Sequence, residues 1–387
     1  MLKLLHTADW HLGRRFSFFP EEGQKKLSRA RMDVVTKILE VARRNAVNAI
    51  LCVGDIFDDP DPTPDFWQGL AKIFRTHPGT HPPLFLVPGN HDPLTPDSVW
   101  APGHPFRAQL PEWVHVVDRE NFTYELSPTA ILYAQPCQSK AGEKDLAMTL
   151  PAREPGDERL RIGCVHGCTF DVPGYQTNFP ISRDAGIQRG LDYLAIGDAH
   201  SFRDVTESVL VPTVYPGAPE PTGFDDRGAG HVALVAMFRR GLRPRVDAEK
   251  VAFWRWIEVR CRDMNELRNL LTTPDLDRHV VRLRLDMTVS LAEESEVERI
   301  LSDLRGTDAT HGRAGVLVED RSGLRLQTGS GNAFPKDLPP VLMDTVTRLD
   351  GLVADATEEW ERARATRALA HLYKLLQSRD SIGGHGR

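Results

Sequence analysis

The chain has 387 residues, 41% of them hydrophobic and 26% charged, which is the balance of an ordinary globular protein and excludes wholesale disorder. Its net charge of −6 gives no bulk support for nucleic-acid binding, so any such site needs a local basic patch. No apolar run approaches the roughly 18 residues that span a bilayer, and the N-terminus lacks a signal-peptide pattern. The five cysteines are odd in number and lie mostly in apolar runs, which predicts reduced thiols in a cytoplasmic protein without membrane association.

Short apolar runs bounded by polar or glycine-rich turns recur through the first 200 residues and predict buried strands. The predicted strands lie at residues 2–5, 49–53, 84–87, 162–165 and 193–196, with a closing strand at 232–238. Between the first two, apolar residues repeat with a helical period, which predicts a helix over 27–44. Strands that alternate with a helix in this way predict an α/β layered core.

The pattern changes after about residue 250 and predicts a small separate domain of α+β type. The predicted elements are a strand at 254–261, a helix at 263–271 with an aspartate cap, a strand at 281–289, a second helix that ends at residue 304 and a strand at 315–318. Ser290 and Glu293 form the spacing of a capping box at the start of the second helix.

The sequence of the C-terminal part predicts a linker followed by one amphipathic helix. Residues 326–340 are rich in Gly, Ser and Pro, as linkers are. From Leu342 to Ala363, apolar residues step by four and three alternately, the heptad pattern of a helix that meets another helix. That other helix belongs either to a partner or to the chain itself, and the preceding linker favours a partner. The predicted organisation is a first α/β domain at 1–250, a cap domain at 251–325, a linker at 326–340, a helix at 341–378 and a disordered tail at 379–387.

Each of the five predicted strands of the first 200 residues is followed by polar residues of the metal-binding type. These clusters are Asp9-Trp10-His11, Gly54-Asp55, Gly89-Asn90-His91-Asp92, His166-Gly167 and Gly197-Asp198-Ala199-His200. In an open α/β sheet, the loops at the carboxyl ends of strands line one crevice. A single Gly-Asp pair is usually a turn, but five clusters at the same end of five strands predict one common site.

Carboxylate, imidazole and amide oxygen ligands suit Mn, Fe or Zn without any cysteine. The first ion is expected to bind Asp9, His11, Asp55 and His200. The second is expected to bind Asn90, His166 and Asp198, with Asp55 as the bridge. Two such ions about 4 Å apart activate a water nucleophile and neutralise a phosphoryl oxygen. His91, left without a metal, is placed to stabilise the transition state or to protonate the leaving oxygen, and Asp92 to orient its imidazole.

This series of motifs resembles the calcineurin-like metallophosphoesterases. Within them, "HTADWHLG", "VPGNHD" and the segment Tyr215–Glu220 resemble the SbcD-type, YhaO-like DNA repair nucleases, bacterial relatives of the nuclease subunit of the MRN complex. The resemblance implies a four-layer β-sandwich flanked by helices, with a small α+β cap domain and a C-terminal helical segment. It also implies a homodimer that processes DNA ends as an exonuclease or endonuclease beside an SMC-like ATPase of the SbcC type. The implied cofactors are two divalent ions, Mn²⁺ first, with Fe²⁺, Mg²⁺ or Zn²⁺ as alternatives.

One position departs from the family pattern. The family reads Gly-His-x-His at the fifth cluster, where this chain has Asp198 two residues before His200. A carboxylate still ligates and favours Mn or Mg, but its negative charge reduces the Lewis acidity of the ion that it binds. We expect two metals to bind, with an altered metal preference or slower turnover.

Two other functions compete with DNA cleavage. One is a phosphodiesterase for cyclic nucleotides or other small molecules, for which the cap domain and the C-terminal helix are superfluous. The other is a non-catalytic scaffold that binds DNA ends. Candidate groups along a DNA path are Arg14 and Arg15 beside the first cluster, Lys25, Lys26, Arg29 and Arg31, then Arg239, Arg240, Arg243 and Arg245, and Arg282 with Arg284. The simpler alternative for each is a solvated face balanced by neighbouring acids.

Overall fold

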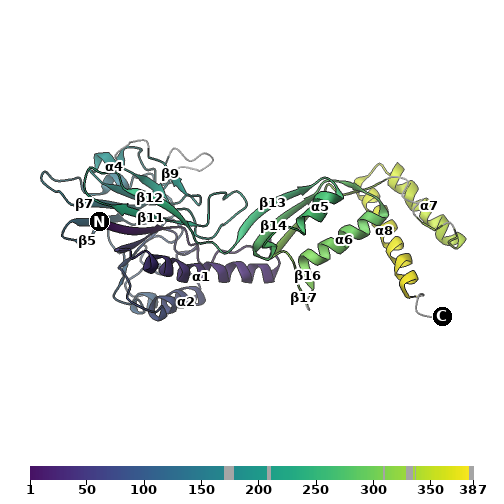
Figure 1. The fold of residues 1–387 in the computed structure, drawn as a ribbon, viewed down its shortest axis with the longest axis horizontal. Helices are drawn as coiled ribbons and strands as arrows, with labels where there is room; N and C mark the ends of the chain where they lie inside the picture. The colour runs from purple at the N-terminus through teal and green to yellow at the C-terminus, as the bar shows by residue number, and fades with distance from the viewer. Residues whose placement is uncertain (170–177, 207–210, 308–309, 328–333, 336, 383–387) are drawn as a thin grey trace. The chain divides into compact units, whose positions relative to one another are not determined.

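The computed structural model of the protein describes residues 1–169, 178–206, 211–307, 310–327, 334–335 and 337–382 (Figure 1). The chain forms two compact units, Met1–Arg255 and Trp256–Arg387. None of the helices in the described ranges is long and apolar enough to cross a membrane. All five cysteines are buried free thiols.

The first unit contains two six-stranded sheets within the described residues. The first sheet has the order β12-β11-β1-β2-β3-β4, and its strands are β1 (Leu2–Thr7), β2 (Ala49–Val53), β3 (Leu84–Val87), β4 (Val114–Val116), β11 (His231–Met237) and β12 (Arg245–Lys250). Strands β1 to β4 run parallel, whereas β11 pairs antiparallel with both β1 and β12.

The second sheet has the order β5-β6-β7-β8-β10-β9. Its strands are β5 (Phe122–Ser127), β6 (Ala130–Gln135), β7 (Leu160–His166), β8 (Tyr193–Gly197), β9 (Arg203–Asp204) and β10 (Thr213–Tyr215). The parallel pairs are β6 with β7, β7 with β8 and β8 with β10. Helices α1 (Glu21–Arg44), α2 (Pro64–Thr76) and α3 (Pro105–Ala108) share a core with the first sheet, and η1 (Ala147–Thr149) and α4 (Ala185–Gln188) share one with the second.

Alternate side chains of each central strand pack on opposite faces of the sheet, in different layers of the core. In β2, Leu51 and Val53 enter the core between the two sheets, while Ile50 and Cys52 pack against the helices. Both faces of the strand are therefore buried, which explains why the parallel strands read as unbroken apolar runs. The resulting order of helices, sheet, sheet and helices confirms the predicted four-layer α/β class.

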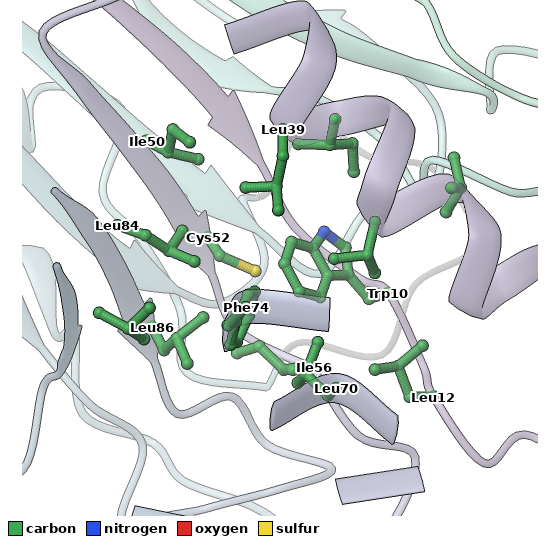
Figure 2. Close-up of a cluster of buried hydrophobic side chains, with 14 of the residues drawn as sticks. Trp10, Leu12, Leu39, Ile50, Cys52, Ile56, Leu70, Phe74, Leu84 and Leu86 are labelled. Atoms are coloured by element: carbon green, nitrogen blue, oxygen red, sulfur yellow. The ribbon is translucent and has the colours of Figure 1, made fainter. Parts of the chain in front are cut away.

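Figure 2 shows the helical side of the first sheet, where Trp10 lies among side chains from the strands and from α1 and α2. Trp10 is 1% exposed, and its indole N–H donates to the hydroxyl of Thr7 at 2.9 Å. Since Trp10 lies between Asp9 and His11 in sequence, its burial anchors the turn that carries both polar residues.

The second unit has a three-stranded sheet of order β13-β14-β18 and two main helices over it. Its elements are β13 (Arg255–Cys261), α5 (Met264–Leu270), η2 (Leu276–Arg278), β14 (His279–Leu285), β15 (Thr288–Val289), α6 (Leu291–Arg305), β16 (Gly306–Thr307), β17 (Thr310–His311), β18 (Val316–Asp320) and β19 (Arg325–Leu326). The cap of Asp263 on α5 and the capping box of Ser290 and Glu293 form as predicted. The predicted strand 281–289 is interrupted, because its last residues form β15 and pair with β19 instead.

The prediction of one C-terminal helix at 341–378 was wrong. The structure has two, α7 (Pro340–Asp355) and α8 (Glu359–Ile382), here called the C-terminal hairpin. The chain turns at Ala356, where the backbone becomes extended, and the apolar positions fold back on one another: Val346 and Val353 share a core with Leu369. That core also includes Leu291, the first residue of α6. Of the predicted linker, residues 328–333 and 336 lie outside the described residues. The disordered tail predicted for 379–387 was wrong for residues 379–382, which belong to α8, and residues 383–387 lie outside the described residues.

Replacing Trp10 tests whether burial of its side chain stabilises the first unit. We expect Trp10→Ala to lower the free energy of unfolding by about 3–5 kcal/mol, the usual cost of emptying a buried aromatic position. Chemical denaturation followed by far-ultraviolet circular dichroism measures it. Phe18→Ala, at a position 57% exposed, is the control and should lower it by less than about 1 kcal/mol. Equal losses in the two variants would contradict the anchoring role.

Candidate metal centre

The structure brings together the seven residues predicted as metal ligands. They are Asp9, His11, Asp55, Asn90, His166, Asp198 and His200, called the metal cluster below. These candidates follow β1, β2 and β3 of the first sheet and β8 of the second, and His166 is the last residue of β7. The five strands divide between two stacked sheets, as the predicted four-layer sandwich implies, so the common crevice lies at strand ends of both sheets and not of one open sheet.

The backbone of the metal cluster is held in unusual conformations. Asp9, His11, Asp55 and Asp198 all have positive φ, at 55°, 45°, 51° and 116°. L-residues with side chains avoid this region, and a residue held there costs of the order of 1–3 kcal/mol. Hydrogen bonds between turns maintain the geometry: the amide of Asp9 donates to the carbonyl of Gly54 at 3.0 Å, and that of His11 to the carbonyl of Asp55 at 2.9 Å.

Two glycines allow the strand ends to approach His166. A Cβ atom at Gly54 would lie 1.9 Å from Nδ1 of His166, and one at Gly197 would lie 2.7 Å from the same atom. Gly54 also has a φ of 90°, which favours glycine. Nδ1 of His166 instead lies 3.0 Å from the carbonyl oxygen of Val53, which orients the ring and directs Nε2 into the cluster.

One half of the metal cluster consists of Asp9, His11 and His200, whose donor atoms all lie within 4.8 Å of one another. The Nε2 atoms of the two histidines face each other at 3.1 Å. Burial lowers the pKa of His11 to about 3, so this imidazole is neutral, the form that binds metals.

The other half contains Asp9, Asp55 and His166, again with donor atoms within 4.8 Å. Nε2 of His166 lies 2.8 Å from Oδ1 of Asn90 and 3.8 Å from Oδ1 of Asp198. Oδ2 of Asp55 is 3.5 Å from that nitrogen and 3.7 Å from Nε2 of His11. This oxygen therefore lies between the two halves, where it could contact an ion in either of them.

The buried carboxylates of the metal cluster favour the binding of cations. Burial raises the pKa of Asp9 to about 7 and also raises that of Asp198, because ionised carboxylates are poorly solvated there. Burial alone would lower the pKa of His166, but the carboxylate of Asp55, with those of Asp9 and Asp198, raises it well above its usual value. A positive charge is therefore favoured among these carboxylates, and hard oxygen and imidazole donors fit divalent ions of the Mn, Fe or Zn kind.

His91 lies at the rim of the metal cluster, with a side chain 42% exposed. Its ring stands edge-on to that of His11, with centroids 4.9 Å apart. The residue beside its Nδ1 is Asp58, whose carbonyl oxygen is 3.3 Å away and whose Oδ1 is 3.8 Å away. Oδ1 of Asp58 also lies 2.9 Å from Nδ1 of His11. Asp58 was not predicted from the sequence, although it lies in the turn that begins with Asp55.

The role predicted for Asp92 needs correction. Its carboxylate is fully buried and accepts hydrogen bonds from the backbone amides of Gly89 and Phe57, at 2.8 and 2.9 Å. It therefore ties the turns after β2 and β3 together, whereas Asp58 lies beside the imidazole of His91.

His200 has a support that sequence reasoning also missed. Its Nδ1 lies 2.7 Å from the hydroxyl oxygen of Thr222 and 3.6 Å from Oδ2 of Asp226. The Thr222 hydroxyl also lies 2.5 Å from that carboxylate oxygen. Both residues follow the segment Tyr215–Glu220, whose resemblance to the nuclease branch was the available signal.

Most of the basic groups considered for a DNA path contact acids. Arg14 donates to Asp58 at 3.3 Å, and Arg31 is buried. The other pairs are Lys25–Glu21, Arg29–Asp33, Arg240–Glu158, Arg243–Asp204, Arg245–Asp247, Arg282–Glu258 and Arg284–Asp320. Arg15 is exposed and lines a cavity of about 510 Å³ that also borders Asp58.

Comparison with known proteins agrees with this geometry. The profile of the calcineurin-like phosphoesterases matches residues 2–202. The chain belongs to this family. The resemblance seen in the motifs is thereby confirmed, and the matched region contains all seven residues of the metal cluster.

Three relatives are informative. The chain is 25% identical over 277 residues to the uncharacterized metallophosphoesterase YhaO of Bacillus subtilis, which covers 70% of this chain and 65% of the relative. It is 23% identical over 236 residues to the DNA double-strand break repair protein Mre11 of Saccharolobus solfataricus, covering 59% of each. It is 35% identical over 94 residues to the SbcD component of the nuclease SbcCD of Escherichia coli, covering 24% of this chain and 21% of the relative. The chain thus matches less than two thirds of the length of each relative.

The raised pKa of Asp9 predicts a pH-dependent stability of the metal-free protein. In the folded chain this carboxyl keeps its proton up to about pH 7, whereas in the unfolded chain it ionises near its ordinary pKa of 3.8. Its contribution is therefore fully present below about pH 3.8 and is lost progressively as the pH rises to about 7. Asp9→Asn has no proton to lose, so we expect the melting temperature of the variant minus that of the wild type, measured in EDTA, to increase from pH 4.5 to 7. The exposed control Asp65→Asn should show no such trend, and a pH-independent difference for Asp9→Asn would contradict the assignment.

Proposed function

We propose that the chain is a dinuclear metal-dependent phosphodiesterase that processes DNA ends, with Mn²⁺ as the preferred ion. The observation that carries the proposal is the convergence of carboxylates and imidazoles from four strand ends, with the amide of Asn90 from a fifth, on adjoining groups of donor atoms. Membership in a phosphoesterase family supports ester hydrolysis, and the names of two relatives, a component of a nuclease and a DNA break repair protein, support DNA as the substrate. A cytoplasmic location belongs to the proposal and is supported by the free thiols.

The proposed roles follow from the positions of the residues. Asp9, His11, Asp55 and His200 would hold one ion, and Asn90, His166 and Asp198 the other, with Asp55 shared. The pair of ions, when bound, would supply Lewis acidity and lower the pKa of a bound water.

His91 is not one of the seven proposed ligands, although its donor atom also groups with those of His11 and Asp58. Its side chain is 42% exposed at the rim, so we assign it the donation of a proton to a leaving oxygen. Asp58 keeps that ring in place through its carbonyl and carboxylate oxygens. Arg15 is the proposed phosphate contact beside the site, and Arg14, which donates to Asp58, has a weaker claim to that role.

The test is hydrolysis of linear duplex DNA and of bis-p-nitrophenyl phosphate in the presence of Mn²⁺. We expect the wild type to cleave both, and Asp55→Ala to lose at least about 1,000-fold in rate on each, because the proposed bridge between the ions is removed. The matched control is Asp65→Ala, an exposed aspartate on α2, which should retain wild-type rates.

The other outcomes identify the competing functions. Cleavage of the small substrate alone, with DNA affinity that does not fall with salt, would favour a small-molecule phosphodiesterase, since phosphate contacts give steep salt dependence. Activity on neither substrate, with DNA binding retained, would favour a scaffold in which Asp198 has impaired the site.

We further propose that the active form is a homodimer and that the C-terminal hairpin docks on the coiled coil of an SMC-like ATPase of the SbcC type. The name of the Escherichia coli relative marks it as one part of a larger nuclease. Although the hairpin buries part of its apolar surface within the second unit, Val341, Leu352 and Trp360 remain 77%, 49% and 56% exposed. Exposed apolar groups on neighbouring helices are the feature expected of a helical docking surface.

A double substitution tests the docking surface without removing the hairpin. Leu352→Glu with Trp360→Glu should abolish capture of the purified ATPase, because charges replace the apolar contacts, while hydrolysis of bis-p-nitrophenyl phosphate stays unchanged. Phe238→Glu, at an apolar position 53% exposed in the first unit, is the control and should leave capture intact. Undiminished capture by the double variant would show that the hairpin packs on its own unit only.

A further inference from the structure

Arg31 lies on the buried side of α1 and is 2% exposed. One terminal nitrogen of its guanidinium donates to the carbonyl of Trp10 at 3.1 Å, and the other donates to the carbonyl of Pro221 at 2.7 Å. The guanidinium also lies over the ring of Phe16, 5.3 Å from its centroid. A single planar cation thus connects two segments that lie 211 residues apart at Trp10 and Pro221.

Both segments belong to the same half of the metal cluster. Trp10 lies between Asp9 and His11. Pro221 precedes Thr222, whose hydroxyl lies 2.7 Å from Nδ1 of His200. The two carbonyls that Arg31 holds therefore belong to the two turns on which this donor set depends.

Burying a guanidinium in this way is costly. Its Nε has no hydrogen-bond partner among the described residues, and removing the cation from water carries a penalty of several kcal/mol. The nearby acid Glu220, 3% exposed, accepts hydrogen bonds from the backbone amides of Phe253 and Trp254. Lysine carries a point charge and lacks the planar fork that reaches two carbonyls at fixed spacing.

We propose that Arg31 is a positioning residue that fixes the separation between the Asp9–His11 turn and the His200 support, and thereby sets the affinity of one of the two cation sites. The inference rests on the proposed function, since it requires the metal cluster to bind divalent ions. It also explains why a basic residue that the sequence placed on a DNA path is buried.

The chain supplies a matched control in Arg161. This arginine is 1% exposed, and its terminal nitrogens donate to the carbonyls of Ala152, at 3.1 Å, and of Pro151. Its guanidinium lies over the ring of Tyr133, 4.5 Å from the centroid, and its Nε also lacks a partner among the residues described. Arg161 therefore has similar burial and the same pair of carbonyl contacts, with an additional ion pair to Asp157 at 3.5 Å, but neither carbonyl belongs to a turn of the metal cluster.

The experiment titrates Mn²⁺ into the full-length wild type and into Arg31→Lys, Arg31→Gln and Arg161→Lys by calorimetry, with melting temperatures measured in parallel. We expect two sites in the wild type. Both Arg31 variants should bind at one site 10- to 100-fold more weakly, the usual effect of losing an outer-shell support, and within twofold of the wild type at the other. Arg161→Lys should lower the melting temperature without changing either affinity.

Wild-type affinities in Arg31→Lys would overturn the proposal, as would an equal weakening in Arg161→Lys, because the effect would then be a general consequence of lost stability. Arg31→Lys keeps the charge and the aliphatic stem, so it decides the question if Arg31→Gln does not fold. Should the wild type bind Mn²⁺ but hydrolyse neither substrate, the proposed function fails while the titration still decides the role of Arg31.

Discussion

The presence of Asp9, Asp55 and Asp198 in one buried cluster is the constraint on which the rest of the first unit depends. Charged carboxylates in a poorly solvated place repel each other, and their burial is tolerated only with compensating positive charge. His166 supplies part of this charge, since the neighbouring carboxylates raise the pKa of its imidazole. The account of a dinuclear phosphodiesterase follows from this local excess of negative charge more than from any single motif.

The surrounding structure keeps these groups together against their repulsion. Left-handed backbone at four of the metal cluster residues directs their side chains inward, and the missing side chains of Gly54 and Gly197 let the strand ends approach. Burial of Trp10 anchors the first turn, and Asp92 links the next two. Arg31 contributes a connection between turns on opposite sides of one donor set. The site is thus formed by strand ends of both sheets, held together by contacts between their turns.

The sequence was sufficient to predict the layered class and the seven residues that converge, because parallel strands buried on both faces are continuous apolar runs whose ends carry the polar groups. It was not sufficient to divide the strands between two sheets, since both sheets have the same local pattern. Asp92 was assigned to His91 because they are adjacent in sequence, yet a fold brings distant backbone amides to a buried carboxylate. The heptad seam of the C-terminal part was equally misleading, because two helices that pack on each other show the same spacing as one helix that packs on a partner.

The most direct test of the central claim is anomalous scattering from crystals of the protein soaked in Mn²⁺. The account predicts two manganese peaks about 4 Å apart, with the carboxylate of Asp55 between them, Asp9, His11 and His200 around one, and Asn90, His166 and Asp198 around the other. A cluster without manganese, or a single ion bound away from Asp55, would contradict it.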